Sequence, residues 1–220
     1  MIPASTLKFL KDLKKNNTKT WFDNNRKTYE TARLQFMETV GELIKEIAKF
    51  DPYIASQEPK DCLFRINRDV RFSKDKSPYK TNFGAYFNKG GKKSNGAGYY
   101  LHVEPGQAFA AGGMWMPLPA DLVKIRQEID YSFDEWKKFT GSAAFKKNFS
   151  GGVEADAVLS RPPKGYEDTN PAIEFIKMKS FVVRKSLPDP LLQSKAFVKE
   201  VAATYKAMKP LVDFLNRAVE

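Results

Sequence analysis

The side chains best suited to bind an anion are concentrated in one segment, CLFRINRDVRFSKDKSPYKTNFGAYF, residues 62–87. Three of the chain's nine arginines, Arg65, Arg68 and Arg71, fall within seven residues there. A guanidinium group donates two parallel hydrogen bonds to a phosphate or carboxylate, and a lysine ammonium adds a point charge. The segment therefore predicts a pocket for a small phosphorylated or carboxylated ligand, built on an Arg-rich strand and the loop that follows it.

Side chains alternate along a strand, and this separates the three arginines. Arg65 and Arg71 share one face of a strand predicted over residues 63–72, whereas Arg68 lies on the more apolar face. A buried guanidinium needs a carboxylate partner, so we predict a structural ion pair between Arg68 and Asp75. The predicted ligand contacts are Arg65, Arg71, Ser73, Lys76, Tyr79 and Lys80.

Two alternatives to ligand binding stay open for this segment. Residues 61–93 carry nine basic and three acidic residues, a net +6 of the chain's total of +11. Such charge, interleaved with aromatic residues, is also typical of a nucleic-acid surface, although Phe83 and Phe87 fall on an apolar strand face. In the other alternative the arginines are purely structural, in a salt-bridge network, and the chain is a partner-binding module.

Candidates for acid–base chemistry are few. His102 is the only histidine, and in YYLHVEPG it shares a strand face with Tyr100 and Glu104. If the strands pair as predicted, this face adjoins that of Asp69, so the catalytic candidates are His102, Glu104 and Asp69. A lone histidine in a strand is more commonly a hydrogen-bonded structural residue than a catalyst. The residues therefore indicate no particular reaction, and whether the chain is an enzyme stays open.

The composition excludes several kinds of site. Cys62 is the only cysteine, which rules out an internal disulfide and a multi-cysteine zinc site, and a single histidine rules out a two-histidine metal motif. Gly112 and Gly113 are not part of a G-x-G-x-x-G loop, so a bulge or close packing under Trp115 is expected there. We predict no metal and no cofactor, while a carboxylate-rich magnesium or calcium site stays open as an alternative, although no D-x-D-x-D-G loop appears.

Hydrophobic periodicity predicts the elements that position these residues. Helical spacing predicts a short helix capped by Ser5, a long helix over about residues 21–50, and helices over residues 120–129 and 132–141, the last capped by Ser132. Alternation predicts strands over residues 63–72, 81–88, 99–104, 107–115 and 180–187. The last 30 residues return to helical spacing, with Pro210 expected to kink or divide the helix. This order predicts an α+β fold, a largely antiparallel sheet flanked by N-terminal and C-terminal helices.

The chain shows no repeat and no long linker, which predicts a single domain over residues 1–220, with a division into 1–117 and 118–220 as the alternative. No apolar run approaches the roughly 18 residues of a membrane span. Lysines interrupt every apolar stretch near the N-terminus, so no signal peptide is expected. A cytoplasmic protein without a membrane partner is the expectation.

The segment FRINRDVRFSKDKSPYKTNFGAYF resembles the signature of an uncharacterised family of bacterial and fungal proteins, the domain of unknown function 2461 family. The family pattern, approximately R-x-x-R-D-x-R-F-S-x-D-K-x-P-Y-K, is carried by Arg65, Arg68, Asp69, Arg71, Phe72, Ser73, Asp75, Lys76, Pro78, Tyr79 and Lys80. FLKDLKKNNTKTWFDNNRKTYE, GYYLHVEPG, GGMW, PPKGYEDTNP and KMKSFVVRKSL are also similar, whereas ARLQFMETV lacks a proline expected near Phe36. The resemblance covers nearly the whole chain and implies a single domain with no known activity.

Overall fold

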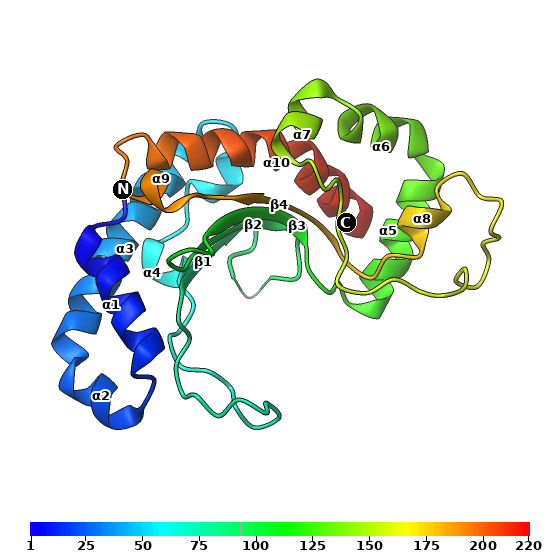
Figure 1. Cartoon of the computed structure of the whole chain (residues 1–220). Coiled ribbons are helices and arrows are strands. Elements are labelled where there is room, and N and C mark those ends of the chain that lie inside the picture. Colours follow the sequence, from blue (N-terminus) through cyan, green and yellow to red (C-terminus); the bar gives the residue numbers. More distant parts are fainter. Residues whose placement is uncertain (93) are drawn as a thin grey trace. The chain divides into compact units, whose positions relative to one another are not determined.

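A computed structural model of the chain describes residues 1–92 and 94–220. Its sheet has four antiparallel strands in the order β1 (Phe83–Asn88), β2 (Gly98–Val103), β3 (Phe109–Met114) and β4 (Phe181–Ser186). The helices α1 (Ala4–Lys15), α2 (Lys19–Asn24) and α3 (Arg26–Ala48) precede the sheet in the chain, and α10 (Phe197–Val219) follows it (Figure 1). The predicted α+β class, with helices at both ends of the chain, is confirmed.

The chain forms two compact units, each assembled from interleaved segments. Unit 1 comprises Met1–Phe87, Tyr100–Ala110 and Ser186–Ala203. Unit 2 comprises Asn88–Tyr99, Ala111–Lys185 and Thr204–Glu220. The single domain expected from the sequence, and its alternative division after Pro117, stay predictions.

The core of unit 1 forms where the apolar face of β1 meets α1 and α3. The ring of Phe83 lies 5.3 Å from that of Phe36 on α3 and 6.3 Å from that of Phe9 on α1. All three side chains are buried, and burial of such large apolar groups is the dominant favourable term in folding. The opposite face of the sheet in unit 1 leaves Tyr100 and His102 half-buried and accessible to polar partners.

The helix predicted over residues 21–50 is wrong in its extent, because two helices occupy this stretch. Asn25 separates α2 from α3 in a non-helical conformation, with φ −108° and ψ 16°. Thr18 starts α2 by accepting a hydrogen bond from the backbone N–H of Trp21 at 3.3 Å. The predicted Ser5 cap is also wrong, because Pro3 takes the N-cap position of α1 and Ser5 donates its hydroxyl to Gln35.

The strand predicted over residues 63–72 is not formed. After η1 (Pro52–Ile54) and α4 (Pro59–Cys62), the chain makes two isolated antiparallel bridges, Leu63 with Ala85 and Asn67 with Tyr79, on an otherwise irregular path. The physical reason is local competition. Charged side chains of this segment bond to one another and to neighbouring backbone groups, which offers the chain an alternative to a regular ladder.

The core of unit 2 gathers around Trp136 of α6 (Phe133–Thr140), whose side chain is completely buried. Its ring lies 5.2 Å from Phe175 of α8 (Ile173–Ile176), 5.2 Å from Phe214 of α10 and 6.2 Å from Phe181 of β4. Two more helices complete the unit, α5 (Pro119–Tyr131) and α7 (Ala143–Asn148), whereas α9 (Asp189–Leu192) belongs to unit 1. These aromatic contacts join four elements that are distant in sequence.

Three residues that the sequence analysis singled out have local roles in α6, α10 and β3. Ser132 takes the N-cap position of α6, but it donates its hydroxyl to Glu128 and makes no capping bond. Pro210 lies inside α10 without dividing it. Gly113 has φ +124°, and a Cβ there would lie 2.0 Å from the carbonyl oxygen of Phe181 on β4. Gly113 therefore permits close backbone approach to β4, while Trp115 is 55% exposed.

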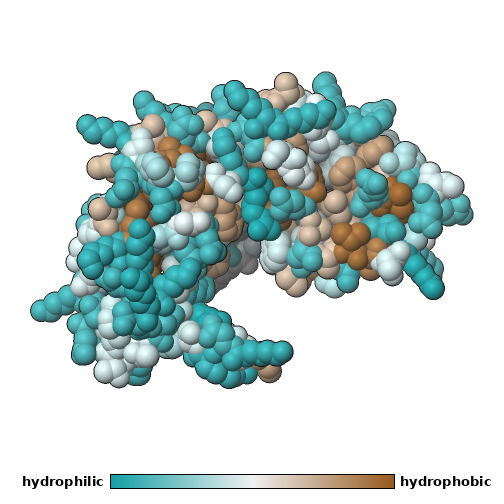
Figure 2. Space-filling view, in the orientation of Figure 1, coloured by the Kyte–Doolittle hydropathy of each residue, from teal (hydrophilic) through white to brown (hydrophobic). Residues whose placement is uncertain are grey.

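Among the residues that the structure describes, no helix combines the length and the apolar character that crossing a membrane requires. Figure 2 shows hydrophilic residues over most of the visible face, with small hydrophobic patches between them. The most exposed large apolar side chain is Phe72, at 96%. Phe72 lies in the Arg-rich segment, so that segment presents an apolar ring to solvent beside its cations.

Candidate functional site

The Arg-rich segment folds into a hairpin, here called the Arg-rich hairpin and defined as residues 64–80. The backbone N–H of Arg68 donates to the carbonyl of Pro78 at 2.9 Å, and that of Lys80 donates to the carbonyl of Ile66 at 2.7 Å. Beyond these two rungs, residues 69–77 form an extended loop that projects at the bottom of Figure 1. Of the predicted ligand residues, Arg71, Ser73 and Lys76 therefore lie on this loop, whereas Arg65, Tyr79 and Lys80 lie at the base of the hairpin.

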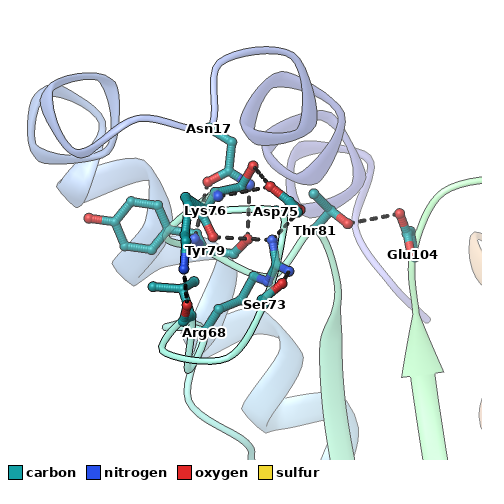
Figure 3. Close-up of polar contacts among 10 residues, drawn as sticks. Asn17, Arg68, Ser73, Asp75, Lys76, Tyr79, Thr81 and Glu104 are labelled. Carbon is teal, nitrogen blue, oxygen red and sulfur yellow. Dashed lines mark hydrogen bonds and ion pairs between the residues drawn. The ribbon is translucent and has the colours of Figure 1, made fainter.

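Arg68 holds this loop together from within (Figure 3). Its guanidinium pairs with Asp75, and it also donates to the carbonyl of Ser77 at 3.2 Å and to the hydroxyl of Ser73 at 3.3 Å. Asp75 in turn accepts from the hydroxyl of Ser77 at 2.7 Å and from its backbone N–H at 2.9 Å. The bonds from Ser77 and Arg68 lower the pKa of Asp75 to about 2. The Lys76 ammonium makes a further hydrogen bond across the loop, to the carbonyl of Val70 at 3.0 Å.

Asn17 and Tyr79 attach the hairpin to the helices of unit 1. The Asn17 amide donates to the carbonyl of Tyr79 at 2.9 Å and accepts from its backbone N–H at 3.1 Å, as a neighbouring strand would (Figure 3). The Tyr79 ring stacks on Phe22 of α2, with 4.0 Å between ring centroids. Tyr79 is only 6% exposed, so this predicted ligand residue is placed as a support of the hairpin.

The loop presents a charged and aromatic tip to solvent. Arg71 binds Asp69 through two bonds, of 3.0 and 2.7 Å, which lower the pKa of Asp69, and all of these groups are exposed. The Arg71 guanidinium also lies 5.8 Å from the ring centroid of Phe72. Arg65 is exposed nearer the base of the hairpin, and Lys80 lies with its ammonium 5.3 Å from the Phe64 ring.

A row of polar side chains follows β2, here called the β2 polar row and defined as Tyr100, His102 and Glu104. His102 Nδ1 lies 3.2 Å from the Tyr100 hydroxyl, and Nε2 lies 3.3 Å from a Glu104 oxygen. The other Glu104 oxygen accepts from Thr81 at 2.9 Å and from Lys14 at 3.0 Å (Figure 3 shows the bond to Thr81). The His102 ring is also stacked on Phe109, 4.6 Å away. Strand alternation thus brings two catalytic candidates, His102 and Glu104, into contact.

The charges of the row follow from burial and hydrogen bonding. Burial tends to raise the pKa of Glu104, but the bonds from Lys14, Thr81 and His102 outweigh it and hold this pKa below its usual value. Burial lowers the pKa of His102 in spite of the neighbouring carboxylate, and burial raises the pKa of Tyr100 to about 12. At neutral pH a charged Glu104 can only accept hydrogen bonds. The neutral imidazole therefore donates a hydrogen bond from Nε2 to Glu104 and accepts one from the Tyr100 hydroxyl at Nδ1. A carboxylate-oriented imidazole of this kind is chemically able to accept a proton.

The structure separates the third catalytic candidate from this row. Asp69 bonds to Arg71 at the hairpin tip, so the predicted convergence of strand faces is wrong, because residues 63–72 do not continue the sheet. Phe64 connects the two regions, since its ring lies 5.9 Å from that of Tyr100. Within residues 1–92 and 94–220, no group of three or more histidine, cysteine, aspartate or glutamate side chains is placed to hold a metal ion.

A scan against family models matches residues 5–214 to the family described as "Conserved hypothetical protein (DUF2461)". The chain belongs to the DUF2461 family. A search of curated proteins and a search of solved structures each returned no match. The description of the DUF2461 family names no function.

Several residues of the site were not found from the sequence of this DUF2461 chain. Asn17 bonds to Tyr79, 62 residues later, and Lys14 bonds to Glu104, 90 residues later. A local sequence pattern does not predict contacts between residues so far apart. Thr81 had a weaker signal, because it lies two residues before β1 and Glu104 directly follows the neighbouring strand β2. Lys93, the last residue of the basic segment 61–93, lies outside the described residues.

Proposed function

We propose that this chain binds a small phosphorylated or carboxylated ligand on the Arg-rich hairpin. The observation that carries the proposal is an imbalance of charge. Residues 64–80 contain six basic and two acidic residues, a net +4. Both acids are already engaged, Asp69 with Arg71 and Asp75 with Arg68, so the hairpin's own carboxylates leave this +4 uncompensated. An oxyanion ligand would supply the missing negative charge.

The internal bonding of the hairpin supports binding by an ordered surface. Arg68 fixes the loop through three neighbours, and Asn17 fixes its base to unit 1. Ordering the loop before the ligand arrives reduces the conformational entropy lost on binding. Arg65 and Arg71 are the exposed arginines that present donors, and the Arg71–Asp69 pair is solvent-exposed and therefore weak enough to exchange for a ligand.

The proposal is tested by titrating the protein with inorganic phosphate, pyrophosphate and citrate under calorimetry at low salt. At least one oxyanion should bind saturably, and Arg65→Ala combined with Arg71→Ala should weaken it at least tenfold without unfolding the protein. Lys27→Ala combined with Lys195→Ala removes the same charge from exposed sites of unit 1 outside the hairpin. Equal weakening by this control pair, or no saturable binding by any of the three anions, would refute the proposal.

Single-stranded nucleic acid is the second candidate ligand, and Phe72 is the observation that favours it. A 96% exposed phenylalanine beside Arg71 offers a stacking surface next to cations. Phe83 and Phe87 are buried, so they are not available to bases. Phe72→Ala should then weaken oligonucleotide binding, measured by fluorescence anisotropy at low salt, and leave phosphate binding unchanged. No anisotropy change with single- or double-stranded oligonucleotides would exclude this candidate.

A further inference from the structure

Arg126 in unit 2 is a buried cation whose charge the surrounding side chains do not neutralise. It lies on α5 between the buried residues Ile125 and Ile129, and it is itself only 9% exposed. Burial lowers the pKa of Arg126, but a guanidinium stays protonated at neutral pH. A desolvated charge of this kind is costly unless an anion accompanies it.

The protein partners of Arg126 are neutral backbone carbonyls. Nε donates to the carbonyl of Ile176 at 2.7 Å, and Nη2 donates to the carbonyl of Met178 at 3.2 Å. These two bonds tie α5 to the end of α8, which gives the arginine a structural role. A guanidinium has five N–H donors, so three remain, including both on Nη1. Carbonyl dipoles satisfy individual donors but leave the net charge in place.

The acidic residues closest to Arg126 in the sequence of α5 are directed to other partners. Glu128 accepts from Arg217 at 2.9 Å, and Asp130 accepts from Asn170 at 2.7 Å. In the described part of the chain, no ion pair joins Arg126 to a carboxylate. Arg217 provides the contrast, because this exposed arginine pairs with both Glu128 and Glu135. Exposed Arg217 thus has two carboxylate partners, and buried Arg126 has none among the described residues.

Tyr166 is a titratable neighbour of Arg126, because its phenolate, when it forms, raises the pKa of Arg126. Burial and the charge of Asp130 raise the pKa of Tyr166 although Arg126 opposes them, so its hydroxyl keeps its proton at neutral pH. It can therefore donate a hydrogen bond to an anion. Tyr166 lies in PPKGYEDTNP and Met178 in KMKSFVVRKSL, two segments for which the hairpin proposal has no use.

We propose that Arg126 anchors a second anion site, which binds the phosphate or carboxylate group of a small ligand. Nη1 and the remaining N–H of Nη2 bind the oxyanion, and the Tyr166 hydroxyl donates a further bond. Arg126 and Tyr166 both belong to unit 2, so the site is separate from the Arg-rich hairpin of unit 1.

The experiment is an NMR titration of the arginine Nε–H signals of the full chain with inorganic phosphate and, separately, acetate. The Arg126 signal should shift saturably with one of these anions, and the anion that acts identifies the headgroup. The Arg217 signal should stay in place, because the carboxylates of Glu128 and Glu135 already pair with this guanidinium. Tyr166→Phe should weaken binding about threefold to tenfold. The hairpin pair Arg65→Ala with Arg71→Ala should leave the Arg126 response unchanged, which separates this site from the hairpin site.

Arg126→Lys keeps the charge but removes the planar fork, and it should abolish the saturable response of the remaining unit 2 signals. Should that variant fail to fold, the wild-type titration and Tyr166→Phe still decide the question. An Arg126 signal that does not move at 50-fold excess of either anion overturns the proposal. So does a response that Tyr166→Phe and Arg126→Lys both leave intact.

Discussion

Arg68 and Asp75, seven residues apart, form an ion pair that folds the tip of the Arg-rich hairpin back on itself. The side chain of Arg68 is 25% exposed, whereas that of Arg71, which pairs with Asp69, is 76% exposed. Arginines three residues apart thus serve different purposes, one ordering the loop and the other meeting solvent. This division allows the structural and the binding roles of the hairpin to be tested separately.

Replacing Arg68 should loosen the hairpin. Arg68→Met removes the bonds to Asp75, Ser73 and Ser77, so we expect a loss in unfolding free energy, which stays small because Asp75 is exposed. Hydrogen exchange of residues 69–77 should accelerate at least tenfold. Arg65→Met, the same substitution at an exposed site, should change neither quantity. Unaltered exchange in Arg68→Met would show that Arg68 does not order the loop.

The amide of Asn17 should be needed to dock the hairpin. Asn17→Ala removes both bonds to the Tyr79 backbone, and we expect a loss of about 1–2 kcal/mol in urea unfolding. Asn17→Asp keeps an acceptor for the Tyr79 N–H but loses the donor to the Tyr79 carbonyl. Its unfolding free energy should therefore also fall below that of the wild type. Wild-type stability of both variants would contradict the assigned contacts.

Acidification should destabilise the protein through His102. Its pKa is lowered from the ordinary value of 6.5, so below that pH the unfolded chain takes up a proton before the folded chain does. Stability is therefore full above pH 6.5 and falls as the pH drops toward the folded pKa, by up to about 1.4 kcal/mol per pH unit for one proton. Urea unfolding between pH 7.5 and 5 should show a slope that His102→Gln reduces.

The same residue offers a direct check on the β2 polar row. Because His102 is the only histidine, its ¹⁵N spectrum can be read without ambiguity. We expect a neutral ring protonated at Nε2 at pH 7, since Glu104 accepts there and Tyr100 donates to Nδ1. Tyr100→Phe should alter the Nδ1 shift and leave the Nε2 proton in place. A ring protonated at Nδ1 would contradict the described network.

Gly113 should tolerate no side chain. Gly113→Ala combines a positive φ with a Cβ 2.0 Å from the Phe181 carbonyl, so we expect a loss of several kcal/mol or failure to fold. Gly152 is the matched control, with φ +68° and no atom within 4 Å of an added Cβ. Gly152→Ala should cost about 1 kcal/mol by thermal unfolding. Similar losses for the two variants would argue against close approach at Gly113.

The regular strands were predictable, because apolar residues alternate with others in the sequences of residues 81–88 and 99–104, although in β1 the structure leaves only Tyr86 half-buried and buries the rest. Residues 63–72 alternate equally well, yet they form an irregular arm and part of the loop of the Arg-rich hairpin. Alternation detects burial on one side but does not register that Arg68 finds Asp75 locally. The α2–α3 break was missed because Phe22 and Tyr29, seven residues apart, are spaced as on one helix, although Asn25 between them is not helical.

Some contacts of the candidate site could also be predicted from the sequence, and others could not. His102 and Glu104 could be paired from the sequence because they are two residues apart on one strand. The attachment of the hairpin by Asn17 could not, because it depends on where α1 ends relative to a loop 62 residues later. Arg126 carried no signal either, since a single arginine on a helix is ordinarily solvated.

The interleaved make-up of the two units has a consequence for synthesis on the ribosome. Unit 1 starts at Met1 but is completed only by Ser186–Ala203, and unit 2 is completed only by Thr204–Glu220. In a nascent chain the Arg-rich hairpin is therefore synthesised long before the last segment of its own unit has been translated. Protection of its exposed apolar surface during that interval falls to chaperones or to transient local structure, and a chain truncated near residue 185 leaves both units incomplete.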